Sequence, residues 1–285
     1  MIRLLNTLFV TVLLASPVYG QHHQSTLDKI KMTKTISMGY RESSFPFSYI
    51  SEDKKPAGYS IDLCTRVAAG VQQHLGLGDL ATQWVVVTPE NRLGMIANGT
   101  LDLECGSTTS TLSRQEQVDF SYMTFVDGAS LLVRGSGDIN RLSDLGGKRI
   151  AVVPGTTTEK VMADALQQAK LTVQMVKVKE HAEGIATLEN GTADAYASDK
   201  VILIGLAMQA KEPATLAIAD QYFSYEPYGL MLRRGDADFR LAVNRVLAHL
   251  YRSGEIVPIY ERWFGSFERT SNLLQAMYLL HSLPE

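Results

Sequence analysis

Apolar positions follow two alternating spacings along most of the chain. Short apolar runs of strand length, such as Thr35 to Tyr40 and Leu101 to Cys105, alternate with stretches whose apolar residues recur at helical spacing. The stretch from Ser60 to Leu75 is of the second kind. Strands that alternate with helices in this way predict an α/β fold with mostly parallel, doubly wound sheets.

The same order of elements occurs a second time later in the chain. Strands are predicted at Arg149 to Val153 and Ala193 to Ala197, with a helix at Glu159 to Ala169 between them. Two α/β passes predict two lobes, and extended segments near Tyr122 to Ser130 and Tyr222 to Tyr228 could connect them.

The last helical stretches indicate how the lobes share the chain. If the amphipathic segments Asp238 to Arg252 and Glu255 to Phe264 return to the first lobe, that lobe is discontinuous. We therefore predict lobe 1 over residues 31–125 and 226–285 and an inserted lobe 2 over residues 126–225. The leucine-rich tail predicts one more helix, packed on lobe 1 or on a partner.

The first twenty residues have the three-part pattern of a secretory signal peptide. Arg3 precedes the apolar run from Leu4 to Ser16, and the small residues Val18 and Gly20 follow at cleavage positions. The apolar run is too short to span a membrane comfortably, and a signal anchor is the alternative. We expect residues 1–20 to be removed near Gly20 and the mature protein to be periplasmic.

The composition narrows the classes of partner. A formal net charge of −3 without a basic tract argues against nucleic acid, and no metal-ligand spacing or cofactor motif is present, so neither metal nor cofactor is expected. An exported compartment would allow the two cysteines, Cys64 and Cys105, to form a disulfide. The sequence leaves two separate buried thiols equally open.

A short polar segment after a predicted strand could seat an anion. Ser107 and Thr109 offer hydroxyl and backbone N–H groups, and Arg114 can grip a carboxylate with two parallel hydrogen bonds. Ser113 followed by Glu116 resembles a capping box, which would place Arg114 in the first turn of a helix. The alternative is a surface loop with a solvated arginine.

Other polar residues lie at the predicted ends of strands. In lobe 2, Thr156 to Glu159 is a Thr-x-x-Glu helix start that favours an anion and contains Thr157. Asp199 could receive an ammonium group or merely cap a helix. His181 would more commonly be a capping or surface residue. The candidate site is thus Arg41, Arg92, Ser107, Thr109, Arg114, Thr157, His181 and Asp199.

Several words of sequence occur in an order that is typical of one family. They are GYRESSFPFSY, AGYSIDL, NRLGMIANGTLDLECGSTTSTLSRQEQVDFS, PGTTTE, TLENGTADAYASD, YGLMLRRGD and SGE followed by YERWF. From about Lys34 to Phe267 the chain resembles the periplasmic solute-binding proteins of polar amino-acid ABC transporters, especially the glutamate/aspartate branch. The resemblance implies a type II fold in which two lobes close over a free amino acid, and a membrane ABC permease as partner.

The resemblance also implies a role for each candidate residue. Arg114, with Thr109 and the backbone around Thr157, would hold the ligand's α-carboxylate, and Asp199 with Ser107 would hold its ammonium. Cations of the glutamate/aspartate branch for the distal carboxylate correspond to Arg41, Arg92 and His181. A cysteine of the family is replaced by Leu230, so the resemblance implies that Cys105 lacks its usual neighbour.

The charges of these residues favour an acidic amino acid. The three arginines against Asp199 leave an excess of positive charge, which a ligand with two carboxylates and one ammonium would reduce. We therefore predict a binding protein for glutamate or aspartate that acts as a monomer and is not an enzyme. The alternatives are a periplasmic enzyme of the cyclohexadienyl or arogenate dehydratase kind and a receptor ectodomain.

Overall fold

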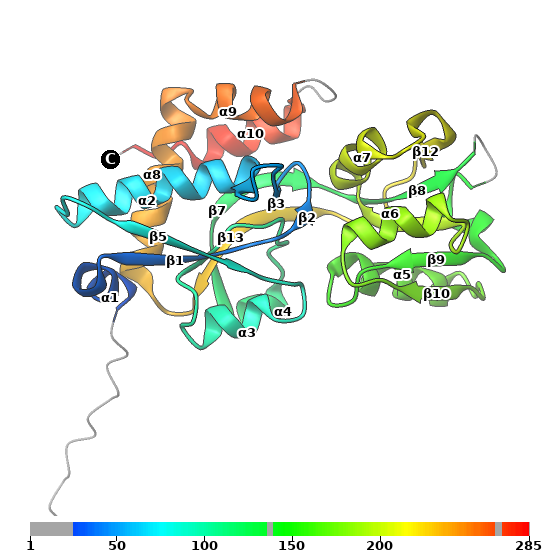
Figure 1. Ribbon diagram of the computed structural model, residues 1–285, viewed down its shortest axis with the longest axis horizontal. Helices are drawn as coiled ribbons and strands as arrows, with labels where there is room; N and C mark the ends of the chain where they lie inside the picture. Colours follow the sequence, from blue (N-terminus) through cyan, green and yellow to red (C-terminus); the bar gives the residue numbers. More distant parts are fainter. Residues whose placement is uncertain (1–24, 136–138, 266–269, 285) are drawn as a thin grey trace, which may run out of the picture.

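The computed structural model describes residues 25–135, 139–265 and 270–284. The predicted signal peptide, residues 1–20, lies outside these residues. The described strands form two five-stranded sheets and one small three-stranded sheet. Figure 1 shows the two larger sheets in two bodies, which we call lobe 1 and lobe 2, joined by extended segments. Within the described residues, no helix combines the length and apolar character needed to cross a bilayer.

The sheet of lobe 1 has the order β5-β1-β6-β13-β7. Its strands are β5 (Ala81–Val86), β1 (Thr35–Tyr40), β6 (Leu103–Glu104), β13 (Glu226–Arg233) and β7 (Val118–Asp127). Strand β1 is parallel to β5 and β6, whereas β13 is antiparallel to β6 and β7. The late strand β13 therefore belongs to the same sheet as the early part of the chain.

The sheet of lobe 2 has the order β10-β9-β11-β8-β12. Its strands are β10 (Gln174–Lys177), β9 (Arg149–Val152), β11 (Ala195–Asp199), β8 (Ala129–Arg134) and β12 (Leu216–Ile218). Strand β9 is parallel to β10 and β11, and β8 is antiparallel to β11 and β12. The two-lobed α/β fold is confirmed, and each sheet is mixed rather than mostly parallel because strands that change lobe enter antiparallel.

Helices cover both sheets (Figure 1). In lobe 1, one face carries α2, α8, α9 and α10, and the other carries α3 and α4. The helices of lobe 1 are α1 (Thr26–Thr33), α2 (Tyr59–His74), α3 (Arg92–Ala97), α4 (Leu112–Gln115), α8 (Ala237–Ser253), α9 (Ile256–Phe264) and α10 (Asn272–His281). Those of lobe 2 are α5 (Thr157–Gln168), α6 (His181–Glu189), α7 (Lys200–Gln209) and the 3-10 turns η1 (Leu142–Leu145) and η2 (Pro213–Thr215). The small sheet of β2 (Ser43–Ser44), β3 (Ser48–Ile50) and β4 (Pro56–Ala57) belongs to lobe 1.

The chain passes between the lobes at two neighbouring places. Strand β7 continues through Gly128 into β8, and the return segment enters β13 at Glu226, which pairs with Asp127. A Cβ atom on Gly128 would lie 2.6 Å from the carbonyl oxygen of Ser224, so only glycine lets the two segments pass so closely. Both crossings therefore form one narrow connection between the lobes.

An aromatic cluster fills lobe 1 beside this connection. The rings of Phe47 and Phe125 are 4.9 Å apart, and Phe264 of α9 packs 5.0 Å from Phe125. The tail forms the predicted helix, α10, whose Tyr278 hydroxyl lies 2.8 Å from that of Tyr59. The tail helix thus packs on lobe 1 and supports the strand that leads to lobe 2.

The two cysteines form a disulfide. Cys64 in α2 and Cys105, directly after β6, are joined by an S–S bond of 2.11 Å with a Cα–Cα distance of 6.1 Å. The sequence left this pairing open; the position of the family's usual cysteine is Leu230, and Cys105 pairs with Cys64 instead. Helix α2 packs against the sheet and places Cys64 within bonding distance of Cys105.

Loss of this disulfide should destabilise lobe 1. The bond closes a loop with a sequence separation of 41 residues. The chain-entropy relation gives about 4 kcal/mol of unfolding free energy for a loop of this length. We expect Cys64→Ser with Cys105→Ser to lower the denaturant midpoint accordingly, and dithiothreitol to lower that of the wild type but not of the double variant. An unchanged wild-type midpoint after complete reduction would contradict this.

Candidate functional site

The predicted site residues other than Ser107 gather where the two lobes meet, and we call this group the interlobe site. Arg114 of lobe 1 donates from Nη2 to the carbonyl oxygen of Gly155 in lobe 2 at 3.3 Å. The hydroxyls of Thr109 and Thr157 lie 3.3 Å apart across the same boundary. All but one of the candidates are buried, the exception being the half-buried Thr157. The buried ones are Arg41, Arg92, Ser107, Thr109, Arg114, His181 and Asp199.

The predicted anion seat is formed by main-chain and guanidinium groups. Thr109 bridges antiparallel to Tyr228, and the flanking hydrogen bonds come from the N–H groups of Ser110 and Gly229. In such a pair the N–H and C=O of Thr109 both point away from β13. Its C=O accepts a hydrogen bond from Nη1 of Arg114 at 2.8 Å. The Thr109 N–H and the guanidinium therefore lie on one side and can bind one anion.

The predicted reason for the position of Arg114 is wrong. The hydroxyl of Thr111, not of Ser113, accepts the capping hydrogen bond, which comes from the N–H of Arg114 itself. Helix α4 has only four residues, which make a single turn, so Arg114 does lie in the first turn, but with Thr111 rather than Ser113 as the N-cap. The side chain still reaches the boundary between the lobes because α4 follows β6 closely. Burial lowers the pKa of Arg114, and the nearby Glu226 opposes this shift.

Helix α5 directs its N-terminus at the same place. As predicted, Thr156 is the N-cap and accepts a hydrogen bond from the N–H of Glu159 at 3.1 Å. The N–H groups of the first turn have no partner within the helix, and the helix dipole favours an anion there. Thr157 lies at this first turn, opposite Thr109. Donors of both lobes thus face a common position.

Asp199 ends β11 and occupies the N-cap position of α7, but its side chain does not cap the helix. Its carboxylate makes no capping hydrogen bond to α7; it accepts hydrogen bonds from the hydroxyls of Thr158, at 3.0 Å, and Tyr228. Burial and, second, the negative charge of Glu226 raise the pKa of Asp199 to about 7, while the hydrogen bonds from Tyr228 and Thr158 and the charge of Arg114 oppose the shift. A nearby ammonium group would favour the ionised form. The arrangement therefore suits a cationic ligand group.

Arg92 is held inside lobe 1 by a short polar relay. Its Nη1 donates to the hydroxyl of Thr108 at 2.6 Å, and that hydroxyl donates to Glu104 at 2.6 Å. Glu104 and Arg92 are also an ion pair at 4.0 Å. Burial lowers the pKa of Arg92 to about 9, while Glu104 opposes the shift. Arg92 remains a cation at neutral pH.

Arg41 and His181 meet at the boundary of the lobes. Nη2 of Arg41 lies 2.5 Å from a carboxylate oxygen of Glu180, the residue before α6. The Nδ1 atom of His181 is 2.6 Å from the Tyr196 hydroxyl, and His181 is buried rather than a surface cap. Burial, with the charges of Arg41 and Arg92, lowers the pKa of His181 far below its usual value. His181 is therefore a neutral hydrogen-bonding group at neutral pH.

Two guanidinium groups of the site retain buried donors. Among the described residues, the Nε atoms of Arg41 and Arg92 have no hydrogen-bond partner, and neither has one carboxylate oxygen of Glu104. Buried polar groups are almost always paired, and an unpaired one is costly. These donors can therefore bind an acceptor on a ligand.

Residues 36–266 match the sequence profile of the family described as bacterial extracellular solute-binding proteins, family 3. The chain belongs to this family. It is 39% identical over 262 residues to the L-glutamate/L-aspartate-binding protein of Pseudomonas aeruginosa, covering 92% of this chain and 87% of that protein. It is 37% identical over 250 residues to the glutamate/aspartate import solute-binding protein of Escherichia coli K12, covering 88% and 82%.

Solved structures agree with the fold of this solute-binding protein. An ancestral amino acid-binding protein that is a precursor of cyclohexadienyl dehydratase superposes with a TM-score of 0.73 at 25% identity. That match covers 85% of this chain and 100% of the other.

Several residues of this solute-binding protein's site escaped the sequence analysis. Glu226 and Tyr228 belong to β13, far along the chain, and their contacts depend on β13 entering the lobe 1 sheet. Glu104, at the end of β6, was not among the predicted residues, although it is fully buried beside Arg92. Because Glu104 and Glu226 also carry buried carboxylates, the predicted excess of positive charge is wrong: buried arginines and buried acids are nearly balanced.

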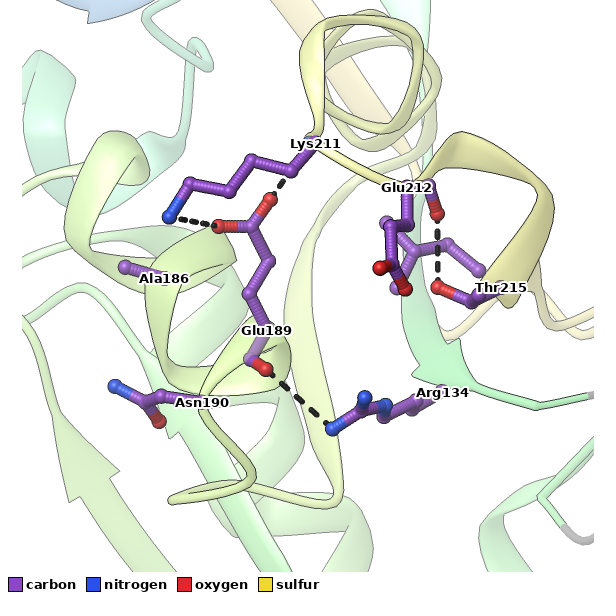
Figure 2. Close-up of a pocket in the computed structure, with 8 residues that line it drawn as sticks. Arg134, Ala186, Glu189, Asn190, Lys211, Glu212 and Thr215 are labelled. Atoms are coloured by element: carbon purple, nitrogen blue, oxygen red, sulfur yellow. Dashed lines mark hydrogen bonds and ion pairs between the residues drawn. The ribbon is translucent and has the colours of Figure 1, made fainter.

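A pocket on the outer side of lobe 2 is a poor alternative site. Figure 2 shows Arg134, Glu189 and Lys211 around this pocket of about 280 Å³. The Lys211 ammonium lies 3.8 Å from the Glu189 carboxylate, and Arg134 donates to the Glu189 carbonyl oxygen at 3.4 Å. Lys211 and Glu189 thus pair with each other and Arg134 has a main-chain acceptor, and no residue of the interlobe site lines the pocket. Within the described chain, no cluster of metal-ligating residues occurs.

Proposed function

We propose that this solute-binding protein captures glutamate or aspartate between its lobes and delivers it to an ABC permease. The observation that carries the proposal is the pair of buried Nε donors on Arg41 and Arg92, which lie in one site with Asp199. A ligand with carboxylates and an ammonium group supplies what these groups lack. The names of the relatives in Pseudomonas aeruginosa and Escherichia coli support the same ligands.

Each part of the ligand has a place in this proposal. The α-carboxylate binds Arg114, the Thr109 N–H and the N-terminus of α5 at Thr157. The α-ammonium binds Asp199, with Ser107 beside it. The distal carboxylate binds Arg92 and Arg41, and the neutral His181 adds a hydrogen bond. Lobe 2, residues 126–225, closes on lobe 1 in residues 31–125 and 226–285.

The remaining features of the proposal follow from the family. The mature protein acts as a monomer in the periplasm after removal of residues 1–20, and it carries its ligand without changing it chemically. The contacts that Arg114 makes with Gly155 and Arg41 makes with Glu180 support a closing motion, since each joins a residue of lobe 1 to one of lobe 2.

A panel of ligands tests the proposal. After refolding to remove bound amino acids, glutamate and aspartate should raise the melting temperature, since each satisfies both the arginines and Asp199. Glutamine lacks the second carboxylate and succinate lacks the ammonium, so both should raise it far less. A shift with succinate equal to that with glutamate would contradict the role of Asp199, and an absence of any shift would contradict the function.

The dehydratase-like structural neighbour keeps an enzyme as the second candidate. Turnover of prephenate or arogenate by the refolded protein, followed by absorbance of the aromatic product, would favour that activity. We expect no turnover, because each acidic residue of the site already holds a structural hydrogen bond or ion pair.

A further inference from the structure

Glu226 lies at the narrow connection and contacts both lobes. It is 1% exposed and begins β13, where the second crossing enters lobe 1. One carboxylate oxygen accepts hydrogen bonds from the hydroxyls of Thr109 in lobe 1 and Thr157 in lobe 2, the latter at 2.7 Å. The other accepts one from Ser224 at 2.5 Å. A single side chain thus links the two lobes at the interlobe site.

These contacts restrict what the threonines can do for a ligand. A hydroxyl has one proton to donate, and in both threonines that proton goes to Glu226. The hydroxyls therefore cannot donate to a ligand carboxylate at the same time. The main-chain N–H of Thr109 points away from β13, and those of Thr157 and Thr158 at the start of α5 have no partner within the helix, so they remain available.

We propose that Glu226 is a positioning residue that holds the lobes closed through the hydroxyls of Thr109 and Thr157 and leaves the ligand's α-carboxylate to main-chain N–H groups and Arg114. The proposal rests on the function proposed above. It adds Glu226, which contacts no group of the ligand itself and acts through Thr109 and Thr157, which do.

The charge of Glu226 gives the proposal a second, independent consequence. The groups facing Asp199 are Thr158 of α5, Arg114 of α4, and Tyr228 and Glu226 of β13, with Arg92 of α3 nearby. Of these, Glu226 is the anion that raises the pKa of Asp199. A neutral residue in its place should lower that pKa, so that Asp199 would keep its charge, and its affinity for an ammonium group, to lower pH.

Two variants separate the effect of the hydrogen bonds between Glu226 and the threonines from the effect of the negative charge of Glu226. Glu226→Ala removes both, and glutamate should bind about tenfold to a hundredfold more weakly, as expected for hydrogen bonds to a charged group. Glu226→Gln keeps an oxygen that can accept from the threonines, so it should bind more tightly than Glu226→Ala at pH 7.5. Its affinity should also begin to fall at a lower pH than that of the wild type.

A cycle with Thr157→Val tests whether Glu226 acts through this threonine. If it does, Thr157→Val should weaken binding far less in the Glu226→Ala background than in the wild type. Small-angle scattering without ligand should show a more open Glu226→Ala than wild type, a result that depends on no ligand. The proposal would be overturned if Glu226→Ala and the wild type scattered equally, or if the losses of affinity in the double variant were additive. It would also be overturned if the affinity of Glu226→Gln began to fall at the same pH as that of the wild type. If wild-type protein bound no amino acid while Glu226→Ala still opened, the proposed function would fail and the link would stand.

Discussion

In calorimetric titration, Arg114→Ala should bind glutamate about 30-fold to 4,000-fold more weakly than the wild type, as expected for 2–5 kcal/mol lost with one partner of a buried charge pair. The guanidinium is anchored to the Thr109 carbonyl oxygen at 2.8 Å and reaches Gly155 of lobe 2. We assign it to the α-carboxylate, which every amino acid carries. Glutamine, if it binds the wild type measurably, should lose affinity to the same degree.

Arg92→Ala is the matched control for this variant. Arg92 is equally cationic and even more buried, but we assign it to the distal carboxylate. Its loss should weaken glutamate strongly and leave glutamine nearly unchanged. Equal losses of both ligands in Arg92→Ala would contradict the assignment, and a glutamate-only loss in Arg114→Ala would mean that the two roles are exchanged.

Asp199→Asn should remove both the affinity for glutamate at pH 7.5 and its pH dependence. In the wild type the pKa of Asp199 is raised to about 7, mainly by burial. The ligand's ammonium favours the ionised form, so binding below pH 7 must release a proton. Affinity should therefore fall up to about tenfold per pH unit between pH 7 and 5. The variant lacks this titration, and the pKa of His181 lies too low to replace it.

The stability of the free protein distinguishes this result from misfolding. A raised carboxyl pKa means that the ionised form of Asp199 is disfavoured in the folded protein, so its contribution to stability falls as pH rises from about 4 to 7. Asp199→Asn should thus melt at or above the wild-type temperature at pH 7.5 without ligand, yet show no shift with glutamate. The role of Asp199 would be contradicted if Asp199→Asn melted far below the wild type. It would also be contradicted if the affinity of this variant for glutamate fell between pH 7 and 5 as in the wild type.

The sequence predicted the order of elements well because helix and strand periods differ so clearly. The helix after Ser60 and the strand from Thr35 to Tyr40 occur almost as predicted. The pairing directions of the sheets were harder to predict, since β13 and β8 enter their sheets only because the chain changes lobe there. The disulfide depended on the same long-range packing, which places α2 across the end of β6.

The sequence predicted the part of the candidate site that consists of polar residues after the ends of strands. Arg114, Thr157 and Asp199 lie together at the boundary of the lobes for that reason. The acids that balance the arginines were not predictable. Glu104 lies three residues before Ser107, the nearest predicted candidate, and Glu226 begins a distant strand. Nothing in their local sequence distinguishes a buried acid from a solvated one.

The first and last described helices, α1 and α10, both pack on lobe 1. Either end could consequently be tethered to a bead, an electrode or a second protein without restraining lobe 2. A fluorophore at the exposed position of Met208 in α7 would then report a movement of lobe 2 relative to the tethered lobe 1.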